Sequence, residues 1–152
     1  MLFRSAVFSY PISAVFRETP REPRGPWAVP GTYTVRLSVD GRTLSQPLRV
    51  KLDPRVKSSA EDLRAQFERS MDVAREMART RDALERIKAE RARVAEGPAA
   101  EALSVRATTL SDLNARLVTL YEILQEADAA PTSAALEAAE TLRGQVAKAL
   151  AP

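Results

Sequence analysis

The sequence predicts a mainly helical α+β protein, in which an N-terminal β-hairpin or partial sheet precedes an antiparallel three-helix bundle with a long first helix. Seven of the ten prolines lie within residues 1–54, and apolar residues alternate with polar ones in residues 32–52. From residue 58 onward, apolar residues recur at helical spacing. We therefore divide the chain into a β unit at 1–54 and a helical bundle at 55–152.

The segment before the hairpin is apolar at first and then rich in proline. Residues 1–16 carry one Arg, and the alternation at Ala6–Tyr10 is typical of a strand. A signal peptide is the alternative, but Pro11 interrupts the segment and no small-residue cleavage site follows it. Residues 17–31 are predicted to form an extended loop that ends in a Pro-Gly turn. No run approaches the ~20 apolar residues of a membrane span, and the compartment stays unknown.

The predicted hairpin has two strands joined by a two-residue turn. The first strand runs from Thr32 to Val39, and Asp40-Gly41 is a dipeptide that accepts positive φ in such a turn. The return strand, Arg42 to Leu52, contains Pro47, which predicts an edge strand or a bulge. Apolar residues occupy one face of each strand: on the first they are Tyr33, Val35, Leu37 and Val39, and on the return strand they are Leu44, Leu48, Val50 and Leu52. Because two strands alone are marginally stable, we expect the hairpin to pack on the helices or to pair with another chain.

The first predicted helix covers about residues 58–95. It begins at a capping box, Ser58-Ser59-Ala60-Glu61, and would be roughly 55 Å long. Its predicted apolar stripe consists of Leu63, Phe67, Met71, Ala74, Met77, Leu84, Ile87 and Val94.

Two further helices follow, at about 99–128 and 133–150. Gly97-Pro98 ends one helix and begins the next, and residues 129–132 interrupt the chain again. The second helix has leucines at heptad spacing, namely Leu103, Leu110, Leu113, Leu117, Leu120 and Leu124. This pattern is typical of an intermolecular coiled coil or of a bundle within one chain.

Composition excludes several kinds of active site. The 152 residues include no His and no Cys, so there is no Ser-His-Asp triad, no thiolate nucleophile and no zinc site built on those ligands. The carboxylate pairs considered for acid–base chemistry are Asp40 with Asp53, and Glu122 with Glu126 beside Asp128. We expect turns and helix surfaces to explain them. The chain is predicted not to be an enzyme, with no catalytic, cofactor-binding or metal-binding residue and no cofactor.

Charge is unevenly distributed along the chain. Residues 1–57 hold ten basic and four acidic residues, and this excess suggests a nucleic-acid binder as one alternative. Single spacing of the Arg residues favours a solvated surface instead, so we regard nucleic acid as an improbable partner. The aromatic residues Trp27 and Tyr33, near Arg24 and Arg36, suggest stacking on bases or sugars, although a small hairpin core is the simpler explanation.

Two parts of the sequence together resemble a known family. The first comprises residues 24–41 with the element Pro-Gly-x-Tyr-x-Val, and residues 46–55 with the junction Asp53-Pro54-Arg55. The second is the helical segment 120–132. Over about residues 24–150, the chain resembles the C-terminal tail, an Ig-like strand pair plus a helical region, of bacterial sortilin-type BNR-repeat β-propeller proteins. These proteins are often labelled glycosyl hydrolases.

The resemblance implies a partial Ig-like sheet and an extracytoplasmic location. It transfers no catalytic residue, because the propeller that would carry the substrate-binding groups is missing from these 152 residues. The chain is then a detached tail module, either a truncated relative or a fragment. We expect a non-enzymatic structural or protein-interaction module that self-associates or binds a protein partner, with no small-molecule substrate. The alternative is an accessory module of a carbohydrate-processing protein.

Overall fold

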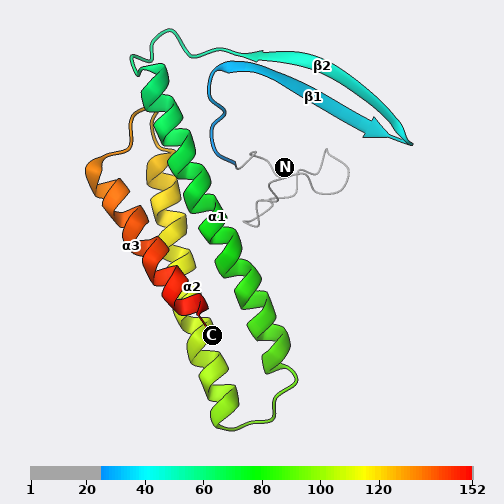
Figure 1. Cartoon of the computed structure of the whole chain (residues 1–152), viewed down its shortest axis with the longest axis vertical. Coiled ribbons are helices and arrows are strands. Elements are labelled where there is room, and N and C mark those ends of the chain that lie inside the picture. The colour runs from blue at the N-terminus through cyan, green and yellow to red at the C-terminus, as the bar shows by residue number, and fades with distance from the viewer. Residues whose placement is uncertain (1–24, 152) are drawn as a thin grey trace, which may run out of the picture.

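The structure, a computed structural model that describes residues 25–151, confirms a two-stranded antiparallel hairpin followed by three helices (Figure 1). The predictions made for residues 1–24 lie outside the described residues. The strands are β1 (Gly31–Val39) and β2 (Arg42–Val50). The helices are α1 (Ala60–Arg91), α2 (Pro98–Leu124) and α3 (Ser133–Leu150). The helices run side by side in alternating directions, and the hairpin projects from the end of the bundle where α1 begins (Figure 1).

The hairpin turn is the Asp40-Gly41 dipeptide that the sequence predicts. Both residues have positive φ, 48° and 75°, so the twist of the turn matches that of the strands. Pairing continues without a bulge, which makes Pro47 a feature of an edge strand. β2 ends at Val50, two residues before the predicted end. The next residue would have to pair with Pro30, which has no amide hydrogen to donate.

A capping box begins α1, one residue later than predicted. Ser59 Oγ accepts from the Asp62 backbone N–H at 3.1 Å, and the Asp62 carboxylate accepts from the Ser59 backbone N–H at 3.0 Å. The predicted start at Ser58, with Glu61 as the acidic partner, is therefore wrong. Ser58 instead donates its hydroxyl to the Asp128 carbonyl oxygen, and this contact ties the start of α1 to the end of the α2–α3 connection.

The buried stripe of α1 agrees with the predicted one at Leu63, Met77, Leu84 and Ile87 and differs from it by one residue over the middle of the helix. Phe67, Met71 and Ala74, which the sequence placed at its centre, are only half-buried. The residues that lie against the other helices are spaced alternately three and four apart, with Ala83 buried beside them: Leu63, Gln66, Ser70, Val73, Met77, Thr80, Leu84 and Ile87. The middle of the predicted stripe was wrong because three of these positions are polar, so a search for apolar residues skips them.

The polar side chains of this stripe contact α2 directly. Thr80, which is fully buried, has its hydroxyl 2.8 Å from Asn114 Oδ1. Ser70 Oγ accepts from Gln125 Nε2 at 2.6 Å. Thr80 Oγ1 also lies within 3.1 Å of the Glu76 and Met77 carbonyl oxygens of its own helix, so the alignment of the two helices depends mainly on the Ser70–Gln125 contact, which a sliding of α1 would break.

Gln66 determines where α2 ends. Its Nε2 donates to the carbonyl oxygens of Leu124 and Ala127, at 2.7 and 2.6 Å. The Leu124 carbonyl is one that a helix end leaves without an intrahelical partner, whereas the Ala127 carbonyl, beyond the helix, also accepts from the Ala129 backbone N–H at 2.9 Å. α2 therefore ends at Leu124, whereas the sequence predicted residue 128.

The heptad leucines of α2 form the centre of the core within this one chain. They pack with α1 and α3, and the five that are almost fully buried are Leu110, Leu113, Leu117, Leu120 and Leu124. α1 ends at Arg91, short of the predicted residue 95. The chain then turns through Gly97, at φ 149°, into Pro98 in the first turn of α2.

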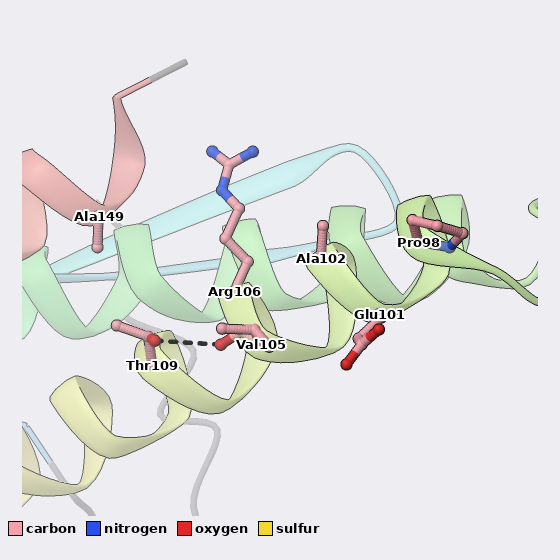
Figure 2. Close-up of a pocket in the computed structure, with 7 residues that line it drawn as sticks. All are labelled: Pro98, Glu101, Ala102, Val105, Arg106, Thr109 and Ala149. Carbon is pink, nitrogen blue, oxygen red and sulfur yellow. Dashed lines mark hydrogen bonds between the residues drawn. The ribbon is translucent and has the colours of Figure 1, made fainter.

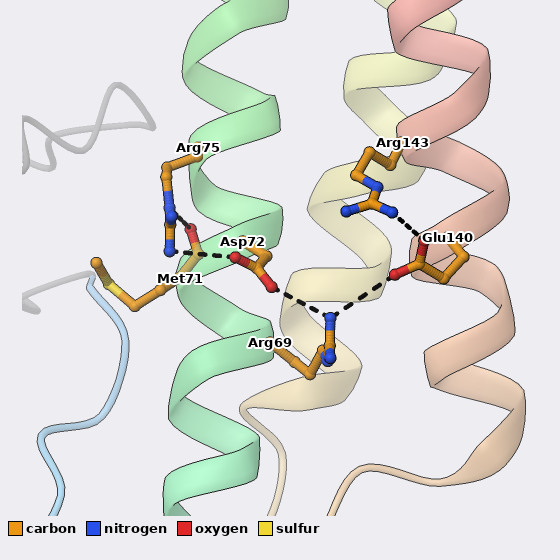
Figure 3. Close-up of polar contacts among 6 residues, drawn as sticks. All are labelled: Arg69, Met71, Asp72, Arg75, Glu140 and Arg143. Carbon is orange, nitrogen blue, oxygen red and sulfur yellow. Dashed lines mark hydrogen bonds and ion pairs between the residues drawn. The ribbon is translucent and has the colours of Figure 1, made fainter.

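α3 is the shortest helix and covers only part of the α1–α2 pair. Its 18 residues span about 27 Å, against about 48 Å for the 32 residues of α1. On the surface, Arg69 Nη1 lies 3.2 Å from an Asp72 carboxylate oxygen and 3.7 Å from one of Glu140, and so links α1 to α3 (Figure 3). The far end of the bundle consists of α1 and α2 alone (Figure 1).

Candidate interaction surface

One face of the hairpin gathers most of the large apolar side chains that the structure leaves exposed. The register pairs Tyr33 with Leu48 and Leu37 with Leu44, and the pair between them is Val35 with Gln46. Because side chains alternate between the two faces along each strand and directly paired residues point to the same face, these residues form a single surface. We call it the apolar face and define it by Tyr33, Val35, Leu37, Val39, Leu44 and Leu48, with Gln46 at its middle.

No part of the bundle covers the apolar face. Its six apolar side chains are between 39% exposed at Tyr33 and 68% exposed at Leu44. No strand residue has its Cα within 8 Å of a helix Cα. At about half exposure, six side chains of this size leave on the order of 500 Å² of apolar surface, near the upper end of what monomeric proteins expose. The expectation that the hairpin packs on the helices is therefore wrong for the described residues.

The opposite face of the hairpin is polar. Ser38 and Thr43 are paired across the strands, with their hydroxyl oxygens 2.9 Å apart. Arg36 and Arg49 lie on the same face as Ser38 and Thr43 and are exposed. The hairpin thus has the two unlike faces of a sheet that normally packs on one side and meets water on the other.

The base of the hairpin is held against the bundle by residues that precede β1. The Trp27 backbone N–H donates to Gln125 Oε1 at 2.9 Å, and the same Gln125 amide donates to Ser70. The Trp27 side chain itself is 63% exposed. This contact connects the hairpin end of the chain to the α1–α2 interface and leaves an aromatic ring open to solvent.

The structure does not bring together the carboxylates considered for catalysis. Asp40 lies at the hairpin turn and Asp53 beyond its base, so a hairpin of about 30 Å separates them. Asp53 accepts from the Arg55 side chain, with Nη2 2.6 Å from Oδ2, and from the Arg55 backbone N–H at 2.9 Å. The Arg55 side chain and this backbone bond hold the pKa of Asp53 below its usual range. Asp53 therefore has a local role in the turn after β2.

The second carboxylate group lies on the surface. Glu122 and Glu126 are exposed near the end of α2, and Asp128 is exposed in the connection that follows. Within residues 25–151, no three Asp or Glu side chains come together in a way that would hold a metal ion. Glu122 fits the helix-surface interpretation made from the sequence, whereas Glu126, which that interpretation placed one turn further along the same helix, lies beyond the end of α2.

The proposed grouping of aromatic and basic side chains is only partly present. Tyr33 and Arg36 have opposite parity on β1 and so point to opposite faces of the hairpin. Arg24 lies outside the described residues. Trp27 remains as an exposed ring near the hairpin base.

A shallow depression of about 470 Å³ lies where α3 ends on α2 (Figure 2). Its floor is mostly apolar, with Ala102, Val105 and Ala149, and its ionisable groups are Glu101 and Arg106. Arg106 Nη2 donates to the Ala151 carbonyl oxygen at 3.2 Å. The depression follows from the shortness of α3 and presents no pair of groups suited to acid–base chemistry.

Sequence reasoning identified the residues of the apolar face but not its exposure. Alternation shows which side chains share a face, whereas the layer that covers the face depends on where the rest of the chain goes.

Comparisons with family models, curated proteins and solved structures find no match for this chain. The resemblance to the tail of β-propeller proteins therefore stays a prediction. No helix within residues 25–151 has the length and apolarity to cross a membrane.

Proposed function

We propose that this chain is a non-enzymatic protein-interaction module that self-associates. The bundle acts as a folded support, and the hairpin supplies the contact surface. The observation that carries the proposal is the apolar face, where six large side chains about half exposed to solvent meet no helix. Surfaces of this kind on a folded protein mark sites of association.

The internal bonding of the bundle supports this division of roles. The bundle has its own apolar core, and its buried polar residues Gln66, Ser70 and Thr80 find hydrogen-bond partners within it. The hairpin lacks a second layer, and a two-stranded sheet needs one to be stable in water. A protein partner that covers the apolar face would provide it.

Light scattering of the full chain between about 1 and 100 µM tests the proposal, since this range brackets micromolar affinity. We expect the weight-average mass to rise above that of one chain as the concentration increases. A mass that stays at one chain over the whole range would contradict self-association.

The resemblance to β-propeller tails suggests a setting for such a module. We propose that the chain corresponds to the C-terminal tail of such a β-propeller protein, with the hairpin as part of an Ig-like sheet. A reading frame for a propeller immediately upstream of the gene would support this, and unrelated neighbouring genes would argue against it.

A second candidate is an accessory module that binds carbohydrate. The exposed Trp27 ring favours it, because aromatic rings present a flat apolar face on which a sugar can stack. A glycan array probed with the full chain and with Trp27→Ala tests this. Binding that disappears in the variant would support the candidate, and absence of binding by the unaltered chain would remove it.

A further inference from the structure

We propose that two copies of this chain associate through their apolar faces, packed face to face with the hairpins antiparallel about a two-fold axis at the Val35–Gln46 pair. The inference rests on the proposed self-association and adds the surface and the geometry. It turns two separate hairpins into a four-stranded sandwich of two layers.

The size of the apolar face suits a second copy. A two-fold contact uses the same patch on both partners, so each apolar face meets an identical one. Burial of on the order of 500 Å² from each copy gives about 1,000 Å² in total, just below the lower limit for stable specific interfaces. We therefore expect a reversible dimer with a dissociation constant in the micromolar range.

The strand bounds determine where the axis must lie. β1 covers residues 31–39 and β2 covers 42–50, so Val35 and Gln46 are the middle residues of the two strands and pair with each other. A two-fold axis that lies between the two sheets, perpendicular to the strands, and passes over this pair lets each strand overlap its counterpart along its full length. It places Val35 over Val35 of the second copy, and Leu44 over Leu48.

The attached bundles favour the antiparallel arrangement. Each bundle is joined to the base of its hairpin, and the tip points away from it (Figure 1). With the hairpins antiparallel, the two bundles lie at opposite ends of the sandwich. A parallel arrangement would bring both bundles to one end, where they would compete for space.

Charge also favours this arrangement. Arg42, next to the turn, is the one ionic residue of β1 and β2 that lies on the same side of the hairpin as the apolar face. Antiparallel hairpins place it at the rim beside Val50 of the second copy, far from the equivalent Arg42. Arg36 and Arg49 lie on the outer faces and remain in water.

Gln46 has a defined role in this geometry. It is exposed in the single chain and lies at the middle of the apolar face. The axis places it opposite Gln46 of the second copy, where each side-chain amide can donate to the carbonyl oxygen of the other. A slip along the strands would bury both amides without partners, so this pair sets the register of the dimer.

Single substitutions on the two opposite faces of β1 test which surface mediates the association. Sedimentation equilibrium of Leu37→Asp should show at least tenfold weaker association than the unaltered chain, because a carboxylate would be buried among apolar side chains. The matched control is Ser38→Asp, on the polar face of the same strand, and it should associate normally. Helicity should be unchanged in both variants, since no helix contacts β1.

The outcomes separate this inference from the proposed function. If the unaltered chain stays monomeric at 100 µM, self-association and the sandwich fail together. If it associates and Leu37→Asp associates equally well, the sandwich is wrong while self-association stands, through another surface.

Single cysteines test the geometry, because the chain contains no native Cys. In the otherwise unaltered chain, Val35→Cys should form covalent dimers with a short bifunctional thiol reagent. Thr34→Cys, on the outer face, should not. Equal cross-linking of the two variants would indicate pairing of strand edges and would overturn the sandwich.

The amide pair offers a pH-dependent test. Gln46→Glu should weaken the dimer at least tenfold at pH 7, because two carboxylates would face each other. Association should recover near pH 4, where a Glu side chain becomes protonated. Association equal to that of the unaltered chain at both pH values would show that the Gln46 residues do not meet.

Discussion

The hairpin and the bundle are both amphipathic, but only the bundle contains the partners for its own apolar surface. Leu110 and Leu117 of α2 are at most 1% exposed, whereas Leu37 and Leu44 of the hairpin are 57% and 68% exposed. The bundle has three helices whose stripes can face one another, and the hairpin has one apolar face and no second layer. Amphipathic patterning therefore indicates a need for burial, and the number of complementary layers in the chain decides whether that need is met.

Substitution of leucine in the two regions should give the largest contrast. Leu117→Ala is expected to lower the free energy of unfolding by about 3 kcal/mol, because the truncation leaves a cavity at the centre of the core. Leu37→Ala should change it by less than about 0.5 kcal/mol at concentrations where the chain is monomeric. Urea denaturation followed by circular dichroism measures both. Comparable losses in the two variants would show that the hairpin is also covered within the single chain.

Removal of the Gln66 side chain should give the next largest effect. Gln66→Ala leaves the Leu124 carbonyl oxygen without its donor, while the Ala127 carbonyl keeps the Ala129 backbone N–H, and we expect a loss of about 2 kcal/mol. Gln145→Ala is the matched control, since Gln145 is exposed and accepts from Arg116 on the surface. Its unfolding free energy should change by less than about 0.5 kcal/mol. Equal effects would mean that Gln66 does not determine the end of α2.

Removal of the Tyr121 hydroxyl should raise the free energy of unfolding, whereas removal of the Gln66 side chain should lower it. Among the described residues its hydroxyl is buried without a hydrogen-bond partner, and burial raises the pKa of Tyr121 to about 12. Tyr121→Phe is therefore expected to stabilise the fold by about 1 kcal/mol. The control is Tyr33→Phe, which removes a hydroxyl that donates to the Val29 carbonyl oxygen and so should give no gain.

The same hydroxyl predicts a pH dependence. The pKa is about 12 in the folded state and about 10 in the unfolded state, so the unfolded chain loses the proton first. Ionisation of this phenol therefore leaves the free energy of unfolding unchanged below pH 10 and lowers it as the pH rises from 10 towards 12. Urea denaturation at pH 9 and pH 11 should show a smaller decline for Tyr121→Phe than for the unaltered chain. Equal declines would contradict the burial of this group.

The surface ion pairs should contribute least to the free energy of unfolding. Arg69 contacts Asp72 and Glu140, but all three side chains are 40% exposed or more (Figure 3). Arg69→Ala is expected to cost at most about 0.5 kcal/mol, and the difference should shrink in 1 M salt. Arg64→Ala is the control, because Arg64 has no ion pair within residues 25–151. A salt-independent loss above 1 kcal/mol would give this group a larger role in the α1–α3 contact.

The parts of the fold that depend on local chemistry were predictable from the sequence. Asp40-Gly41 indicated the turn, and Gly97-Pro98 indicated the boundary between two helices. The leucine heptads of α2 indicated its buried side. In each case the residue type itself restricts the backbone or requires burial.

The parts that depend on partners distant in sequence were not predictable. Thr80 is buried because Asn114 of α2 lies beside it, and this contact determines the true stripe of α1. Ser59 caps α1 because the neighbouring Ser58 bonds to the α2–α3 connection. The candidate surface has the same origin, since Leu44 and Leu48 are exposed only because no helix reaches them.

The shortness of α3 implies a gradient of local unfolding along the bundle. At the far end two helices support each other and α2 begins at Gly97 without a side-chain cap, so that end should fray first. Amide hydrogens near residues 88–104 should exchange fastest among the helices, and protection should increase towards Ser70 and Gln125. The hairpin is joined to the slowly exchanging end. We therefore expect its apolar face to be carried by the part of the molecule that opens least often, which would keep the surface in place when the opposite end of the bundle opens.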